Sequence, residues 1–556
     1  MGNNIYNVVS LQSFTVFAEY FIALSILYIL IVVTLITYNS NGLMLQKSIS
    51  ECSALILFMA CYLMMNDDLI ALDFLSFNHS IINDYFSFIT KFLVCFFSAV
   101  YFLLIADSLK EQKLTSFEYL IIILFAILGL MLMCSSNDLL ITYLAIELSS
   151  LSFYVLASYK KTSTYSVEGG IKYFITGAVS SAFFLLGSSF VYGMSGSITF
   201  CDFHDLFCCS LLDTSFTFFI NENTWVNFYT NLNIPWFERY CIALTKVVLE
   251  SFVVPLLFDF SFLEVGFTLI LFSLFIKLAL APFHLWSLDV YEGSPTSTTI
   301  FFAVITKLSI FVLLIRLCYN AFFSLKDCWQ YYSLWVGVFS VFIGSFGGLK
   351  QRRLKTLMAY SSTSHMGYAL LAMSTATYFS IQMVLFYMVI YMISGLCIWS
   401  IFLFLRLRRK TIAAKYNKEL GDFALLRKSN TPISFALALT MFSLAGIPPL
   451  AGFFAKASVF FQLINTSSYL VALITILCSV VSTFYYIRII KIIFFENLLV
   501  GKLYYPIDSE KTIILSFLTF ALIFLFINPT LLYLICLKVV LTLSPLSSNI
   551  ILISSF

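Results

Sequence analysis

Charged residues are scarce in this sequence: only 11% of its 556 residues are Asp, Glu, Lys or Arg, while 61% are hydrophobic. Soluble domains carry about 25% charged residues, so this composition excludes an ordinary soluble protein. Apolar runs recur along the chain that are long enough to cross a bilayer as helices. The sequence therefore predicts an all-α polytopic membrane protein. The first run, from about Phe14 to Tyr38, is too long for a cleavable signal peptide and is expected to be the first span.

Clustered cysteines and glycine-rich loops are also missing. The 13 cysteines are scattered, with no pair at C-x-x-C spacing, and most lie in apolar runs, where a thiol behaves as a small hydrophobic group. This arrangement argues against an iron–sulfur cluster and a disulfide scaffold. The 21 glycines are dispersed, and no G-x-x-x-x-G-K motif is present, so no phosphate-binding loop is expected. We therefore expect no redox centre, nucleotide site or other cofactor in this chain.

The apolar runs predict about fourteen transmembrane spans. They begin near Phe14, Cys52, Tyr85, Phe117, Leu139, Ile171, Val265, Ser297, Ser333, Leu354, Ile381, Ile433, Leu470 and Ile513. One further span is possible between Leu531 and Phe556. Boundaries predicted in this way are good to a few residues.

Positive charge divides the connecting loops into two sets. The loops after spans 1, 3, 5, 9, 11 and 13 are rich in Lys and Arg, whereas loop 66–84 has four aspartates and neither Lys nor Arg. Since basic residues concentrate in cytoplasmic or matrix loops, the first set is predicted to face the matrix or cytoplasm. Both termini would then lie on the opposite side. The pattern has exceptions, because the loop after span 7 has no basic residue and Arg316 and Lys326 follow span 8.

A long segment from about residue 195 to 263 separates spans 6 and 7 and contains the sequence CDFHDLFCC. Cys201, His204, Cys208 and Cys209 could be drawn as a zinc site. Their spacing fits no common ligand pattern, so we favour an insertion over the outer face with incidental cysteines and predict no metal.

A small set of charged residues remains inside the predicted spans. They are Glu147, Lys172, Lys277, Lys307 and Lys456, with Lys91 at the margin of the set. An ionised group at the bilayer centre costs on the order of 3 kcal/mol on insertion scales, so such groups usually face a polar interior and serve transport. The alternative for a lysine is snorkelling from a helix end. We favour snorkelling for Lys91, leave both interpretations open for Lys172, and favour transport for the three remaining lysines.

Two of these lysines lie beside helix breakers. Span 7 reads SLFIKLALAPFHLW, with Lys277 five residues before Pro282, and span 12 reads SLAGIPPLAGFFAK, with Pro449 ahead of Lys456. Proline inside a span is tolerated where the freed carbonyls face water or polar groups. Broken helices at corresponding places in two halves indicate an inverted-repeat transporter. Spans 4–8 and 9–13 would be these repeats, because an odd number of spans inverts the second.

This symmetry predicts four parts of the chain. Residues 1–116 would hold the first three spans, and 117–320 the first five-helix repeat with its insertion at about 195–263. Residues 321–495 would form the second repeat, and 496–556 a C-terminal transmembrane segment.

The charged residues suggest a proton switch. An apolar environment favours the neutral amine of a lysine, and a nearby carboxylate favours the ammonium form. Bringing Glu147 close to Lys277 would hold a proton there, and separating them would release it to Lys307, a helix–turn–helix distance further along. Lys456 would be the next station. His365 in span 10 could bridge the gap or could simply be a packed hydrogen-bonding residue, and His284 is expected to cap or pack.

Several of these segments resemble the antiporter-like membrane subunits of respiratory complex I. The resemblance rests on five segments: IELSSLSFYVLASYKK, SVEGGIKYFITGAVSSAFFLLG, FIKLALAPFHLWSLDVYEGSP, LKTLMAYSSTSHMGYALLAM and SLAGIPPLAGFFAK. It covers roughly residues 86–494, in order. It implies a fourteen-helix proton-translocating subunit with two inverted five-helix repeats and broken helices 7 and 12. Glu147, Lys172, Lys277, Lys307 and Lys456 would form its central hydrophilic axis.

The resemblance also implies where the remaining chemistry lies. The family's NADH, FMN, iron–sulfur clusters and ubiquinone are bound by partner subunits, which agrees with the absence of such motifs here. The implied partners are neighbouring membrane subunits and lipids such as cardiolipin, and no nucleic acid. The implied location is the mitochondrial inner membrane, with a bacterial plasma membrane as the alternative.

Three functions are consistent with such a chain. The first is a proton-pumping subunit of mitochondrial complex I, and the second is a cation/proton antiporter subunit. The third is a membrane scaffold whose polar residues lock helix packing. Scattered polar groups would favour the scaffold, whereas ionisable groups gathered on broken or adjacent helices favour transport.

Overall fold

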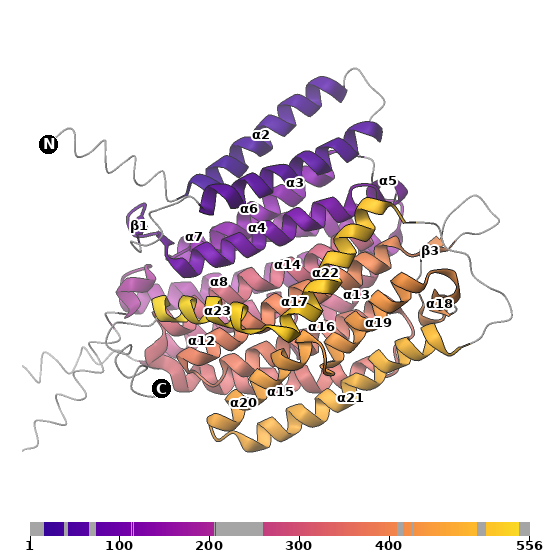
Figure 1. The fold of residues 1–556 in the computed structure, drawn as a ribbon. Coiled ribbons are helices and arrows are strands. Elements are labelled where there is room, and N and C mark those ends of the chain that lie inside the picture. Colours follow the sequence, from indigo (N-terminus) through magenta and orange to yellow (C-terminus); the bar gives the residue numbers. More distant parts are fainter. Residues whose placement is uncertain are drawn as a thin grey trace, which may run out of the picture.

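The computed structural model describes residues 16–37, 43–65, 74–112, 114, 116–204, 206, 260–407, 415–416, 419–424, 426–496 and 507–543. Figure 1 shows that these residues form a bundle of long helices, most of which run side by side. The predicted all-α polytopic architecture is confirmed.

The N-terminal helices lie along one edge of the bundle, indigo in Figure 1, with a short hairpin between them. The elements are α2 (Phe17–Thr37), α3 (Leu43–Met65), β1 (Phe74–Ser76), β2 (Ile81–Asn83), α4 (Tyr85–Ile105) and α5 (Ser108–Glu111). Strands β1 and β2 are antiparallel, with Phe74 opposite Asn83. Helix α3 begins well before the predicted start near Cys52, so Lys47 lies on the helix and not in a loop.

The middle of the chain supplies the centre of the bundle. Its elements are α6 (Glu118–Ser135), α7 (Leu139–Ser158), α8 (Thr164–Ser195), α12 (Phe260–Leu278), α13 (Leu285–Gly293), α14 (Thr296–Ile315), the π-helical turn η3 (Arg316–Ala321) and the 3₁₀ turn η4 (Phe323–Leu325). Helix α14 is buried along its whole length, whereas α8 exposes most of one face.

The rest of the chain completes the bundle. Its elements are α15 (Lys326–Gly348), α16 (Leu354–Met373), α17 (Tyr378–Phe404), β3 (Arg406–Leu407), β4 (Lys415–Tyr416), the 3₁₀ turn η5 (Leu420–Phe423), α18 (Leu426–Ser429), α19 (Thr431–Ala445), α20 (Ala451–Asn465), α21 (Tyr469–Phe494), α22 (Ser509–Ile527) and α23 (Thr530–Leu543). Strands β3 and β4 are antiparallel. Helix α17 packs on α14 at the centre, and α22 and α23, yellow in Figure 1, lie over α17 and α4.

Polar side chains fix where several helices begin. Ser163, Thr377 and Asn430 precede α8, α17 and α19, and each accepts a hydrogen bond from the backbone N–H three residues further on. This N-cap contact satisfies one of the amides that a helix start leaves without a partner. Asp84 and Ser87 cap α4 reciprocally.

Eleven helices among the described residues are long and apolar enough to cross a membrane. The other three predicted spans correspond to α12–α13, α16 and α19–α20. Two of these are interrupted, and α16 carries the polar run SSTSH. The total of fourteen therefore stays a prediction.

The two predicted helix breaks are confirmed. Helix α12 ends at Leu278 and is followed by Ala279 with a φ of 58°, and α19 ends at Ala445 and is followed by Gly446 with a φ of 80°. Left-handed backbone ends a helix, and the prolines that follow cannot donate to its last carbonyls. In the first break, the indole N–H of Trp286 donates to the Ile276 carbonyl at 2.9 Å.

Arg316 was assigned to a loop after span 8, and this was wrong. The residue is 1% exposed and lies in the π-helical turn that continues α14. Its guanidinium bonds the Asp84 carboxylate at 2.7 Å and donates from Nε to the Cys134 carbonyl at 3.1 Å. An aspartate thus compensates the charge, which explains why Arg316 departs from the loop pattern.

Candidate functional site

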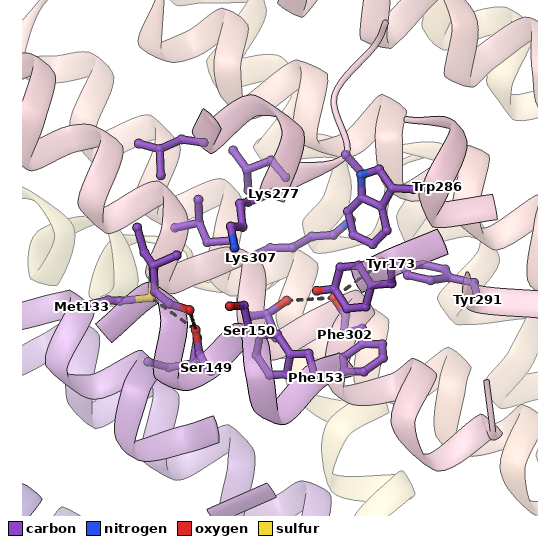
Figure 2. Close-up of a pocket in the computed structure, with 17 residues that line it drawn as sticks. Met133, Ser149, Ser150, Phe153, Tyr173, Lys277, Trp286, Tyr291, Phe302 and Lys307 are labelled. Carbon is purple, nitrogen blue, oxygen red and sulfur yellow. Dashed lines mark hydrogen bonds between the residues drawn. The ribbon is translucent and has the colours of Figure 1, made fainter. Parts of the chain in front are cut away.

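A cavity lies where α12 breaks, between that helix and α6, α7 and α14. Figure 2 shows Lys277 and Lys307 reaching into it, with Ser149 and Ser150 on one wall and Trp286 near the other. The space open to water centres is about 30 Å³. Because one water needs about 10–15 Å³ by this measure, the cavity has room for on the order of two waters.

Lys277 stands in the last turn of α12, one residue before the break. Its amine is buried and has no hydrogen-bond partner. The carbonyl end of a helix carries partial negative charge and favours a nearby cation. The helix break therefore stabilises an ammonium group at Lys277 without engaging it in a bond that fixes its protonation state.

Lys307 occupies the middle of α14 and enters the same cavity. Its side chain is 4% exposed, and its amine has no hydrogen-bond partner. The amine lies 5.8 Å from the centroid of the Tyr391 ring, whose hydroxyl donates to the Ala303 carbonyl at 3.0 Å. The aromatic face attracts a cation without accepting its protons.

Glu147 lies on α7 beside the cavity. Ser150 donates to one carboxylate oxygen at 3.4 Å, and the other oxygen is buried with no hydrogen-bond partner. Glu147 is close enough to Lys277 for electrostatic attraction, yet no hydrogen bond joins them. The two groups therefore stand in the separated arrangement of the predicted switch.

Lys456 is held differently, at the second break. It lies on α20 and is 5% exposed, and its amine donates to the Ala445 carbonyl, at the end of α19, at 2.8 Å. The amine also lies 5.5 Å from the Tyr368 ring centroid. Gly446 makes this possible, since a Cβ there would lie 2.8 Å from Cδ of Lys456.

His365 on α16 lies between Tyr391 and Tyr368, the two tyrosines whose rings contact Lys307 and Lys456. Its ring centroid is 5.5 Å from that of Tyr391, beneath Lys307, and 6.4 Å from that of Tyr368, beneath Lys456. The histidine is 5% exposed. We refer to Lys277, Lys307, His365 and Lys456 as the lysine row, because the structure brings these four predicted residues into one succession across the centre of the bundle.

Comparison with known proteins identifies the family of this chain. Residues 136–233 and 241–482 match the family described as NADH:quinone oxidoreductase/Mrp antiporter, TM. The chain is 34% identical over 457 residues to NADH-ubiquinone oxidoreductase chain 2 of Marchantia polymorpha, covering 82% of this chain and 83% of that one. It is 35% identical over 479 residues to NADH-quinone oxidoreductase subunit N of Pelagibacter ubique, covering 86% and 89%. The chain belongs to this family.

A solved structure places the antiporter-like fold on nearly the whole chain. A chain of respiratory complex I from Thermus thermophilus with bound aureothin superposes with a TM-score of 0.69 at 23% identity, over 93% of this chain and 98% of that one. The segments GGIKYF, YEGSP and AYSSTSHMGY, together with Lys at position 456, are those that most resemble chain 2 within the family.

Lys172 is one predicted site residue that does not reach the lysine row. Its side chain is 44% exposed and pairs with Glu168 and Asp289, each at 2.7 Å. The contact with Asp289 ties α8 to α13 on the outside of the antiporter-like bundle, whereas Glu168 lies on α8 itself. Its neighbour Tyr173 faces inward and lines the cavity, stacked on Trp286 at 4.6 Å.

Lys91 does not snorkel, contrary to our expectation. It is 2% exposed and forms an ion pair with Glu19 of α2, which is 4% exposed. Burial this deep, several residues from either helix end, keeps the amine out of reach of headgroups. Glu19 carries a signal visible in the sequence, since it is an acid inside an apolar run, as Glu147 is.

The structure tests the hypotheses on His284 and on a zinc site only in part. His284 stands at the N-cap position just before α13 but makes no side-chain capping bond, and its ring centroid lies 6.2 Å from that of Tyr360, so it packs rather than caps. The zinc hypothesis also needs Cys208 and Cys209, which lie outside the described residues. Within the residues that the structure describes, no group of His, Cys, Asp and Glu could hold a metal.

Proposed function

We propose that this chain is a membrane subunit of respiratory complex I and that it carries protons along the lysine row. The observation that carries the proposal is the pair of unbonded amines of Lys277 and Lys307 in one water-sized cavity. Intramembrane lysines without counter-charges are costly, and where they occur together they serve ion or proton movement.

The side chains support a specific division of labour. Lys277 and Lys307 exchange protons through water in the cavity, because a protonated amine can give up a proton and a neutral amine can accept it. Glu147 stabilises the ammonium form of Lys277 when its carboxylate is close. When the carboxylate moves away, Lys277 releases the proton. His365 links Lys307 to Lys456. Lys172 is left out of this route because its carboxylate partners hold it outside.

The energy for this movement would come from partner subunits. NADH oxidation by FMN and iron–sulfur clusters and reduction of ubiquinone are assigned to those partners, and this chain contributes no redox group. Neighbouring antiporter-like and small membrane subunits, with lipids such as cardiolipin, are the partners we expect at the exposed faces of α8, α21 and α22.

The chain is a multi-pass membrane protein, and we place it in the mitochondrial inner membrane. Basic loops would face the matrix and both termini the intermembrane space. The high content of Phe (62) and Tyr (32) favours an AT-rich organellar genome over a bacterial one. We retain the division at residues 116, 320 and 495 as the proposed boundaries of the two repeats.

A cation/proton antiporter subunit is the alternative, since the family description includes Mrp antiporters. The composition of the lysine row argues against sodium transport, because hard cations take oxygen ligands. Three of its four members are amines, which suit proton transfer instead.

Purification of the chain from its membrane distinguishes the two proposed functions. The complex I proposal predicts that the chain, extracted in mild detergent, comigrates with a large membrane complex that oxidises NADH. A chain that migrates without NADH-oxidising activity contradicts the proposal and favours the antiporter.

A further inference from the structure

Both ring nitrogens of His365 are occupied by tyrosines and not by lysines. Nδ1 lies 2.6 Å from the hydroxyl of Tyr387 on α17, and Nε2 lies 3.1 Å from the hydroxyl of Tyr486 on α21. A neutral imidazole has one donor and one acceptor nitrogen, so one tyrosine donates to the ring and the other accepts from it. A proton that reaches or leaves His365 must therefore pass through a tyrosine hydroxyl.

The tyrosine on α21 continues into a second buried polar group. Tyr485 is 0% exposed, and its ring centroid lies 4.5 Å from that of Tyr486. The hydroxyls of Tyr486, Ser364 and Ser482 are its polar neighbours, yet the Tyr485 hydroxyl has no hydrogen-bond partner. A buried hydroxyl without a partner is rare in a native structure, and an ordered water is one of the groups that can complete its bonding.

These tyrosines lead from His365 toward one end of the bundle. Gly348 is the last residue of α15, and a Cβ there would lie 2.9 Å from the ring of Tyr485. The turn after Gly348 has the sequence LKQRR, and Arg488 of α21 donates to the Leu349 carbonyl in that turn at 3.3 Å. Tyr485 thus lies next to the basic turn, and Tyr486 lies between Tyr485 and His365.

We propose that Tyr485 and Tyr486 form a proton-uptake branch from the face that bears the basic turn 349–353 to His365. This inference rests on the proposed function, since the branch feeds the lysine row. It assigns entry to the predicted matrix side and to the second half of the molecule. The lysine row runs across the bundle, and the branch meets it at the histidine.

The transfer balances without any group beyond water and the side chains. A hydronium ion beside Tyr485, formed by a proton from the matrix-side solvent, gives that proton to the Tyr486 oxygen as the Tyr486 hydroxyl proton moves to Nε2 of His365, and a neutral water is left beside Tyr485. The ring then carries a proton on both nitrogens and releases the one on Nδ1 through the Tyr387 hydroxyl. The proton ends on a neutral amine of the lysine row, and the ring is left in its other neutral tautomer.

The sharpest test is Tyr485→Phe in the intact complex, reconstituted in sealed vesicles. Because the hydroxyl that is removed makes no hydrogen bond, a structural role predicts unchanged assembly and turnover. The uptake branch predicts normal assembly, a fall in coupled NADH:quinone turnover of about threefold or more, and a larger solvent deuterium isotope effect, since proton supply becomes rate-limiting. Tyr486→Phe should give a fall at least as large.

The matched control is Tyr319→Phe. Tyr319 is buried as well, but its hydroxyl contacts the Met373 carbonyl and Ser380 and not His365. Its turnover and isotope effect should stay normal, and an equal fall there would overturn the proposal. Normal turnover in both Tyr485→Phe and Tyr486→Phe, beside an impaired Lys277→Ala complex, would overturn the branch alone. Normal turnover in Lys277→Ala as well would overturn the proposed function.

Discussion

At the scale of single residues, the buried cations of this chain differ in what holds their charge. Lys91 is paired with Glu19 and Arg316 with Asp84, and a carboxylate partner keeps each charge in place. Lys277 and Lys307 have no hydrogen-bond partner at all. Lys277 and Lys307 can therefore take up and release protons without first breaking an ion pair, whereas Lys91 and Arg316 cannot.

The Glu19–Lys91 pair should stabilise the N-terminal helices without taking part in transport. In Glu19→Gln the Lys91 ammonium loses its buried partner, which we expect to cost about 3–5 kcal/mol and to lower the yield of assembled complex. The double variant Glu19→Leu/Lys91→Met should recover assembly, as measured by the thermal stability of the purified complex. Equal stability of the wild-type and Glu19→Gln complexes would contradict this role.

Sequence alone identified the intramembrane lysines but not their partners. A charged residue inside an apolar run can be recognised from the sequence alone, and so Lys277, Lys307 and Lys456 could be predicted. Whether the charge is paired depends on residues distant in sequence, such as Glu19 for Lys91 and Asp289 for Lys172. The same limit hid the tyrosines that hold His365, because tyrosine is common in every span.

At the scale of elements, the two lysines lie on opposite sides of their helix breaks. Lys277 ends the first half of one broken helix, whereas Lys456 lies in the second half of the other and bonds back to the Ala445 carbonyl. The prolines predicted both breaks, since a missing N–H is a local property. The path of the Lys456 side chain could not be predicted, because it depends on the left-handed turn at Gly446.

Gly446→Ala should therefore disable Lys456 indirectly. A φ of 80° costs a non-glycine residue about 1–2 kcal/mol, and the new Cβ would push Cδ of Lys456 from its position. We expect coupled turnover to fall toward that of a Lys456→Ala complex, measured on assembled enzyme. Gly193→Ala is the control, since nothing lies within 4 Å of a Cβ there. Normal turnover in Gly446→Ala would show that the break tolerates a side chain.

A second element-scale contact attaches α22 to the N-terminal helices. The Lys511 amine lies 3.0 Å from the carboxylate of Asp107, which also faces Lys47 at 3.5 Å. Burial would raise the pKa of Asp107, but these two lysines outweigh it and hold the pKa below its ordinary value. A carboxylate with a lowered pKa stabilises the fold above the unfolded value of about 3.9 and loses that effect as the pH falls through the lowered pKa.

We therefore expect hydrogen exchange at the start of α22 to increase below about pH 4. The Asp107→Asn variant should exchange faster already at pH 7 and show no further change in this window. Exchange that rises equally in wild type and Asp107→Asn would contradict the role of this contact.

At the scale of the whole molecule, α14 and α17 join the two predicted repeats, and the lysine row follows that junction. Composition and hydrophobic runs were enough to predict the class and most spans, because the bilayer demands long apolar helices. Apolarity alone does not settle the number of spans or the repeat boundaries. Helix α16, for example, carries polar residues that contribute to the site, and it is therefore less apolar than the other predicted spans. The insertion after α8 could not be interpreted from its composition.

The predicted topology can be checked by thiol labelling from either side of the membrane. Lys350→Cys lies in the basic turn and Asn465→Cys at the end of α20, and both positions are exposed. A membrane-impermeant reagent should label the first only from the matrix side and the second only from the intermembrane side, above the background of the native cysteines. Labelling of both from one side would contradict the orientation.

The central claim is that protons cross through the lysine row, and Lys277→Ala tests it most directly. Proton pumping and NADH:quinone turnover should be measured together on assembled complex in sealed vesicles, beside the exposed control Lys428→Ala. We predict that both activities fall together in Lys277→Ala and stay normal in Lys428→Ala, with the same amount of assembled complex. Normal coupled turnover in an assembled Lys277→Ala complex would contradict the account.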